Sequence, residues 1–280
     1  MTEELALEAN GLRFRALAAG PPDGPVLLML HGFPEGAESW LPQFDSLVSA
    51  GLRAVAVDLR GYGGSDAPEG EDAYRYEHLV ADVAGLAAAL GRGPVHLAGH
   101  DWGAAVGWAA ATVRPELFLT WTAISMPHPY EWAKAIHDDP EQHRRAAYID
   151  LFRMSGKAEE VLLEDGARRL RRILTGVPES VVDGWARGFE RPGRLTAALD
   201  YYRANLGRRT FEPFREPVRI PTLQVFGDAD IAFSRVPVDA TAGRVEAPYR
   251  LEVLEGAGHW LQFEKPAEIG RLLAEQATSR

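Results

Sequence analysis

The chain has 280 residues, of which 46% are hydrophobic and 25% are charged, proportions that exclude a disordered or fibrous protein and fit one or two globular domains. Its 30 basic and 40 acidic residues give a net charge of −10, the wrong sign for a surface that binds nucleic acid. Cysteine is absent, which excludes disulfides, thiolate nucleophiles and cysteine-ligated metals.

The N-terminal segment is predicted to form a β-hairpin. Residues 5–8 and 12–17 alternate around Asn10-Gly11, a pair that favours a tight primed turn. The first residues are acidic and lack the basic-then-apolar pattern of a secretion signal, and no apolar run is long enough to span a bilayer. We therefore expect a cytoplasmic protein without a membrane partner.

The next part of the chain is predicted to form a parallel sheet. Continuous apolar runs, typical of strands buried on both faces, alternate with amphipathic helices. We expect strands at 26–30, 53–57, 95–98 and 119–124, and helices at 76–90 and 102–113. Such alternation implies crossover connections between parallel strands.

Strand-like runs then disappear between about residues 127 and 213, where the pattern is helical and charged. The arginine-rich run at 168–174 is expected to be a solvated helix face. Strands resume at 222–226 and 250–254, followed by a helix at 266–277. We predict a core domain made of residues 1–127 and 214–280, interrupted by a helical cap at 128–213.

The strongest chemical signal is Gly99-His100-Asp101-Trp102-Gly103, where a predicted strand meets a helix. This is the glycine-flanked nucleophile elbow, with aspartate as the nucleophile. Its glycines relieve crowding in a strained turn. The alternative is that Asp101 merely caps the helix. A carboxylate that attacks a saturated carbon forms an alkyl ester, so the expected electrophile is an epoxide or an alkyl halide.

Hydrolysis of that ester requires a base, and His259 follows the last predicted strand. A histidine suits proton abstraction at neutral pH. Asp228 and Asp230 are both candidates to orient it. The order along the chain, nucleophile then acid then histidine, matches elbow-type hydrolases.

The loop after the first buried strand reads His31-Gly32-Phe33-Pro34-Glu35. Its position is typical of an oxyanion loop, with the N–H groups of Phe33 and Trp102 as the donors. His31 is either a structural support or a catalytic group, and Glu35 either places water or forms a salt bridge. The candidate contacts with substrate or water are His31, Pro34, Glu35 and His100.

No cofactor is expected. A dinucleotide fingerprint and a phosphate loop are both missing from the sequence. His96 and His100 are four residues apart, but they lie on a strand and its turn, so no metal site is predicted.

Four motifs make the chain similar, over nearly its whole length, to the epoxide hydrolases of the α/β-hydrolase superfamily. They are the segments 31–35, 58–66, 99–103 and 258–260. The resemblance implies a mostly parallel central sheet flanked by helices, with the helical cap inserted. It also implies conversion of an epoxide to a vicinal diol, with Asp230 preferred to Asp228 as the partner of His259.

The resemblance further implies two cap tyrosines that donate hydrogen bonds to the epoxide oxygen. Tyr148 begins a tyrosine–x–x–x–phenylalanine segment, and Tyr202 follows Tyr201 in an aromatic–tyrosine–arginine segment. Phenols suit this role because a leaving alkoxide is strongly basic. The alternative is that both tyrosines only pack in the cap.

Two other functions compete with this interpretation. A haloalkane dehalogenase resembles the chain at Asp101-Trp102, but Phe33 does not supply the second halide contact seen in many of them. Fluoroacetate dehalogenases usually have arginine where Trp102 stands. A ligand-binding protein without turnover is disfavoured because all three triad residues are present. The expected partners are a small apolar epoxide and water, in a monomer or a homodimer.

Overall fold

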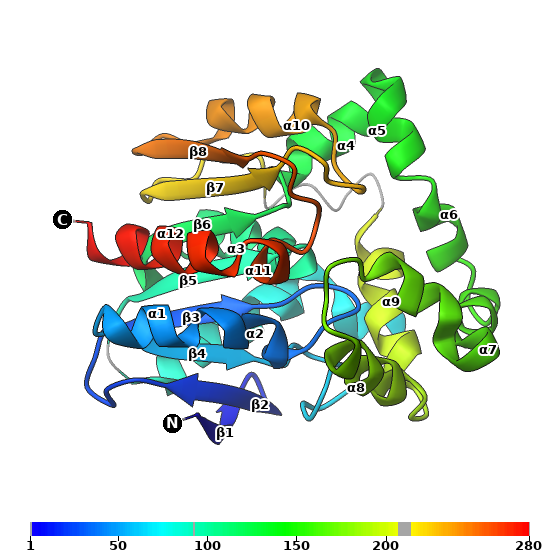
Figure 1. The fold of residues 1–280 in the computed structure, drawn as a ribbon, viewed down its shortest axis with the longest axis horizontal. Coiled ribbons are helices and arrows are strands. Elements are labelled where there is room, and N and C mark those ends of the chain that lie inside the picture. Colours follow the sequence, from blue (N-terminus) through cyan, green and yellow to red (C-terminus); the bar gives the residue numbers. More distant parts are fainter. Residues whose placement is uncertain (1, 92, 207–213, 280) are drawn as a thin grey trace.

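A computed structural model describes residues 2–91, 93–206 and 214–279. An eight-stranded sheet forms its centre, with the strand order β1-β2-β4-β3-β5-β6-β7-β8 (Figure 1). The strands are β1 (Glu3–Ala9), β2 (Leu12–Ala19), β3 (Val26–Leu30), β4 (Arg53–Val57), β5 (Val95–His100), β6 (Phe118–Ile124), β7 (Thr222–Gly227) and β8 (Tyr249–Leu254). The hairpin β1–β2 and the pair β2–β4 are antiparallel, and every other pair in the sheet is parallel.

Helices cover both faces of the sheet (Figure 1). Successive side chains of a strand point to opposite faces of the sheet. Because every position of β3 is apolar, its side chains contribute to two hydrophobic cores, one on each face. Leu28 and Leu30 pack on the face covered by α2 (Tyr76–Ala89) and α3 (Trp102–Val113). Leu27 and Met29 pack on the face covered by α1 (Phe44–Ser49) and α12 (Pro266–Thr278). The predicted α/β-hydrolase fold is confirmed.

The segment between β6 and β7 is helical in its described part. Its helices are α4 (Pro129–Asp138), α5 (Pro140–Arg145), α6 (Tyr148–Phe152), α7 (Lys157–Ile173), α8 (Glu179–Phe189) and α9 (Arg194–Asn205). Two further α-helices, α10 (Arg235–Ala240) and α11 (Leu261–Glu264), follow β7 and β8. The helices from α6 to α9 lie together beside one end of the sheet (Figure 1).

Aromatic contacts join these helices to the loops of the sheet. Phe33, three residues after β3, packs edge-on against Phe152 of α6 and Tyr202 of α9, with ring centroids 5.2 and 5.7 Å apart. Tyr62, after β4, packs in the same way against Tyr201 at 5.5 Å. These helices therefore cover the end of the sheet at which β3 and β4 finish.

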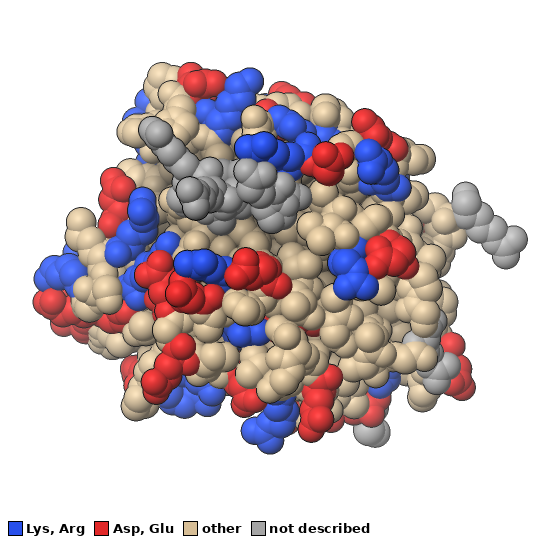
Figure 2. Space-filling view, turned by 180° about the vertical axis from the view of Figure 1, so that it is seen from behind, with Lys and Arg blue, Asp and Glu red and all other residues tan. Residues whose placement is uncertain are grey.

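Charged side chains of both signs are mixed over the face shown in Figure 2. Many arginines have an acidic neighbour, such as Arg271 with Glu275 and Arg235 with Asp239. Among the residues in the described ranges, no helix combines the length and the apolar character needed to cross a bilayer.

Candidate active site

The elbow has the predicted strand–turn–helix geometry. β5 ends at His100 and α3 begins at Trp102, with Asp101 between them at φ 49° and ψ −119°. A positive φ in a residue other than glycine is strained, and such strain is common at functional sites. The Asp101 side chain makes no capping hydrogen bond to α3. The capping alternative therefore has no support in this geometry.

Two glycines allow the close approach of β3 and the elbow. A Cβ atom on Gly103 would collide with the carbonyl oxygens of Leu30 and His31, and one on Gly32 would overlap the side chain of Asp101. The backbone after β3 consequently lies directly against the carboxylate. This contact places the N–H of Phe33 2.8 Å from Asp101 Oδ1, to which it donates a hydrogen bond.

His259 lies between two carboxylates. Its Nδ1 is 2.9 Å from Asp230 Oδ2, within hydrogen-bond distance, and its Nε2 is 3.7 Å from Asp101 Oδ2. Asp230 is 1% exposed, and its other oxygen accepts the N–H groups of Ala232 and Phe233. Of the two acids that the sequence left open, the structure brings Asp230 to the imidazole.

Asp228, by contrast, is exposed and accepts the N–H of Gly256. It closes the turn between β7 and the segment after β8. The backbone of His259 is held separately, because its carbonyl oxygen accepts hydrogen bonds from His100 Nε2 and Ser125 Oγ, both at 2.8 Å.

The charges of this cluster shift its pKa values in opposite directions. Burial opposes ionisation of Asp101, but His259, His100 and the Phe33 N–H together lower the pKa of this carboxyl below 3.8. Burial also opposes protonation of His259, yet the carboxylates of Asp230 and Asp101 raise the pKa of the imidazole well above 6.5. The pair is therefore a carboxylate beside an imidazolium.

The two predicted tyrosines come from different helices and line one pocket together with Asp101. Tyr148 is the first residue of α6 and Tyr202 lies in α9, with their rings 6.2 Å apart at 83°. Burial is the main cause that raises the pKa of both phenols above 10. Both hydroxyls consequently stay protonated at neutral pH and can donate hydrogen bonds.

The pocket has a volume of about 270 Å³, and most of its wall is apolar. Sequence reasoning did not identify Phe152, Leu162, Arg169, Ile173, Ile231, Ala232 and Trp260, which complete the lining. The sequence contains only weak signals that two of these residues line the pocket: Phe152 is one helical turn after Tyr148, and Trp260 follows His259. A metal-binding group of three histidine or acidic side chains does not occur in the part of the chain that the structure describes.

The other predicted contacts with substrate or water do not line this pocket. His31 is fully buried, with Nδ1 donating to the Gly32 carbonyl and Nε2 accepting the Leu59 N–H. Pro34 follows a cis peptide bond from Phe33. His100 Nδ1 lies 2.8 Å from Glu35 Oε1, and both side chains are fully buried. The Trp102 N–H makes no hydrogen bond to Asp101 within the described structure.

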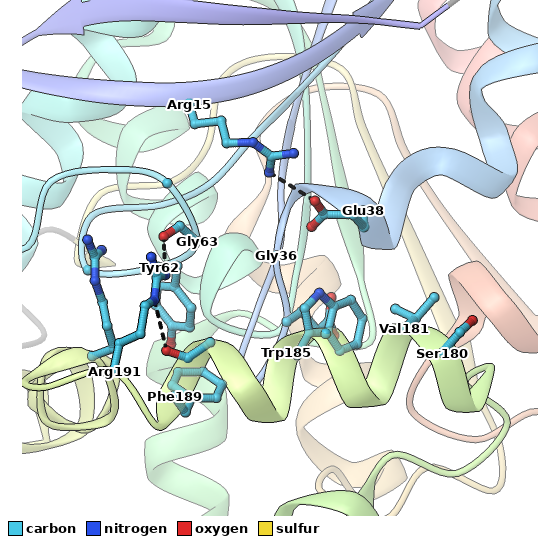
Figure 3. Close-up of a pocket in the computed structure, with 16 residues that line it drawn as sticks. Arg15, Gly36, Glu38, Tyr62, Gly63, Ser180, Val181, Trp185, Phe189 and Arg191 are labelled. Atoms are coloured by element: carbon cyan, nitrogen blue, oxygen red, sulfur yellow. Dashed lines mark hydrogen bonds and ion pairs between the residues drawn. The ribbon is translucent and has the colours of Figure 1, made fainter.

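Glu35 lines a second cavity instead. Figure 3 shows this cavity, which Trp185 and Phe189 also line. This cavity has a volume of about 460 Å³ and lies between α8, with Val181 and Trp185, and the segments that carry Glu38 and Tyr62. Neither Asp101 nor the two predicted phenols line it. The larger of the two cavities is therefore not the one with the reactive carboxylate.

Comparison with known proteins shows which proteins this chain is similar to. The family model for the alpha/beta hydrolase fold matches residues 25–266. Epoxide hydrolase 3 of Xenopus tropicalis is 31% identical in a match that covers 97% of this chain and 76% of that protein. Epoxide hydrolase A of Mycobacterium tuberculosis is 32% identical, with 99% and 97% covered.

A solved structure is also similar to the whole chain. It is a variant of an epoxide hydrolase from Bacillus megaterium, complexed with its product, a naphthyloxy-propane-1,2-diol. The two chains superpose with a TM-score of 0.88 and are 27% identical. The match covers 98% of this chain and 100% of the other.

Proposed function

Because the chain belongs to the epoxide hydrolase family of the α/β-hydrolase superfamily, and is thus a hydrolase that acts on epoxide ether bonds, we propose that it forms a vicinal diol through an ester of Asp101. One observation carries this mechanism. A single pocket contains an ionised carboxylate at a nucleophile elbow, an imidazole and two protonated phenols. Each step of epoxide hydrolysis has a group of matching chemistry there.

Ring opening uses Asp101 with Tyr148 and Tyr202. Since Oδ1 accepts the Phe33 N–H, Oδ2 is the oxygen that attacks a ring carbon. A carbon–oxygen bond forms, the ring carbon–oxygen bond breaks, and the ring oxygen takes a phenolic proton as its negative charge develops. The product of this step is a hydroxyalkyl ester of Asp101.

Ester formation also changes His259. The ester has no charge, so one of the two carboxylates that raise the pKa of His259 is lost. The pKa of the imidazole falls, so the imidazolium returns a proton to the phenolate left by ring opening. The neutral His259 then takes a proton from water while Asp230 holds its Nδ1. The resulting hydroxide attacks the Asp101 carboxyl carbon, and the N–H of Phe33 stabilises the oxyanion. The ester bond between the carboxyl carbon and the substrate oxygen then breaks, and the leaving alkoxide takes the proton of the carboxylic acid formed with it. The diol leaves with the Asp101 carboxylate and the His259 imidazolium restored.

In this scheme the helices α4–α9 serve as the cap, within the predicted boundaries 128–213. The cap contributes the two phenols and much of the apolar wall, whereas the sheet contributes Asp101, Asp230 and His259. Trp102 supplies a second N–H to the oxyanion, since it is the first residue of α3 and the first N–H groups of a helix lack partners within it.

Product analysis tests the proposed function. Purified protein is incubated with styrene oxide and, separately, with a short bromoalkane. We expect diol from the epoxide and no bromide release. Bromide without diol would instead assign the site to dehalogenation and leave the tyrosines a packing role. Tight binding of an epoxide without turnover would indicate a binding protein.

Replacing either phenol should slow ring opening. In Tyr148→Phe or Tyr202→Phe the alkoxide loses one donor, and we expect the rate constant of Asp101 alkylation to fall about a hundredfold. The double variant should fall further. Tyr201→Phe is the matched control, because the Tyr201 hydroxyl donates to the Arg60 carbonyl and does not line the pocket. Stopped-flow tryptophan fluorescence measures alkylation, and an equal loss in all three single variants would contradict the assignment.

The two half-reactions should differ in pH dependence. Asp101 stays ionised because its pKa lies below 3.8, and the phenols stay protonated because theirs lie above 10. Alkylation should therefore be constant between about pH 5 and pH 9. Hydrolysis should speed up as pH rises, since the alkyl-enzyme loses the proton of His259. If single-turnover measurements show that the rate constant of alkylation decreases anywhere in this pH range, the charge states assigned to Asp101 and the phenols are wrong.

A further inference from the structure

One cation stands in the wall of the otherwise apolar pocket. Besides the reactive pair Asp101 and His259, the charged side chain among the described lining residues is Arg169. Arg169 lies in α7 and is exposed, as is Ile231, which is 53% exposed and lines the same pocket. The guanidinium therefore stands where the pocket opens to solvent, with Asp101 at the buried end.

Two other arginines of the run have acidic partners. Arg168 lies 2.7 Å from Asp165, and Arg171 forms an ion pair with Asp183. Arg169 forms neither an ion pair nor a hydrogen bond with any residue in the described ranges. Its charge is free to meet an anion that enters the pocket.

Between the two polar ends, the pocket offers only apolar surface from such residues as Phe152, Leu162 and Ile173. The volume of the pocket is about 270 Å³. A ligand that complements this arrangement of polar and apolar surfaces has an epoxide at one end, an alkyl or aryl segment in the middle, and an anion at the other end.

We propose that the enzyme acts on epoxides that carry a remote carboxylate, and that Arg169 recognises this carboxylate at the pocket mouth. This proposal rests on the proposed function of the same site. A guanidinium matches the two oxygens of a carboxylate with a fork of N–H donors. A single guanidinium neutralises one unit of charge, which favours a carboxylate over a phosphate dianion. The residue acts on specificity and takes no part in bond making or breaking.

The experiment compares each acid with its own neutral ester. The terminal epoxides of hexenoic and undecenoic acids are assayed beside their methyl esters, and the ratio of kcat/KM for acid to ester is the readout. We expect at least one wild-type ratio to exceed that of Arg169→Gln by about fivefold, a size typical of an exposed ion pair. The change should fall on KM, because the carboxylate contact is the same before and during ring opening.

Arg172→Gln is the matched control. Arg172 belongs to the same run, is also exposed, and does not line the pocket. The substitution removes the same unit of positive charge, so any effect of overall charge on acid binding appears equally in both variants. Arg169→Lys should retain part of the acid preference, and Arg169→Glu should invert it. Added salt should weaken the preference of the wild type.

The outcomes separate this proposal from the proposed function. Equal acid-to-ester ratios in the wild type, Arg169→Gln and Arg172→Gln, with diol formed from all substrates, would overturn recognition by Arg169 and leave the hydrolase assignment intact. Equal losses in Arg169→Gln and Arg172→Gln would also overturn it, in favour of long-range charge. Absence of diol from styrene oxide and from every ester would instead count against the proposed function.

Discussion

Asp101→Ala should abolish diol formation, with kcat reduced by about ten-thousandfold or more. The substitution removes the nucleophile, so no ester can form and only the unassisted attack of water remains. The Asp101 side chain makes no capping hydrogen bond to α3, so its loss leaves the helix start intact and the fold should persist. Circular dichroism checks the fold, and product analysis with styrene oxide measures the loss.

Asp228→Ala is the control for this variant. It removes an aspartate from a turn at the same end of the sheet, but one whose carboxylate accepts only the Gly256 N–H in the described structure. We expect its kcat to stay within a few fold of the wild type. Diol formation by Asp101→Ala near the wild-type rate would exclude an Asp101 ester and require direct attack of water on the epoxide.

His259→Gln should stop the reaction after its first half. Ring opening uses Asp101 and the phenols, whereas hydrolysis needs the base, so the variant should form one ester per active site and then turn over at least about a thousandfold more slowly. Intact-protein mass spectrometry should show a rise equal to the mass of one substrate. Peptide mapping should place the added mass on Asp101.

Asp230→Ala provides an intermediate case. The imidazole remains, but its Nδ1 loses the partner at 2.9 Å, so hydrolysis should slow while ester formation continues. A His259→Gln protein that forms neither ester nor diol would show that ring opening also depends on the imidazole. One that turns over normally would remove His259 from the mechanism.

The sheet could be predicted from sequence because its strands are short apolar runs between turn signals. The segments 26–30 and 53–57 became β3 and β4 with the expected bounds. The antiparallel pairing of β2 with β4 could not be predicted, since it depends on which edge remains free. The left-handed conformation of Ala167 inside α7 could not be predicted either, because alanine rarely adopts a positive φ.

The candidate site was predictable where its residues are neighbours in sequence. The elbow around Asp101 and the loop around Phe33 are contiguous motifs, and their hydrogen bond follows from the adjacency of β3 and β5. The pocket wall was not predictable, because α6, α7 and α9 meet only through tertiary packing. Arg169 illustrates the difference: most arginines of its run are exposed, as expected for a solvated helix face, yet Arg169 lines the pocket.

The groups of the proposed mechanism belong to two parts of the structure, the sheet and the helices beside its end. The hydrogen bonds on the carbonyl of His259 show that the base belongs with the sheet. His100 precedes the nucleophile and Ser125 follows β6, so both tie the base to the same rigid sheet that holds Asp101. The phenols stand on helices that meet this sheet through aromatic packing. Under the proposed mechanism, ring opening needs both parts in register, whereas release of the diol needs only the sheet. Substitutions in the helices can therefore retune which epoxides are opened while the second half-reaction stays intact.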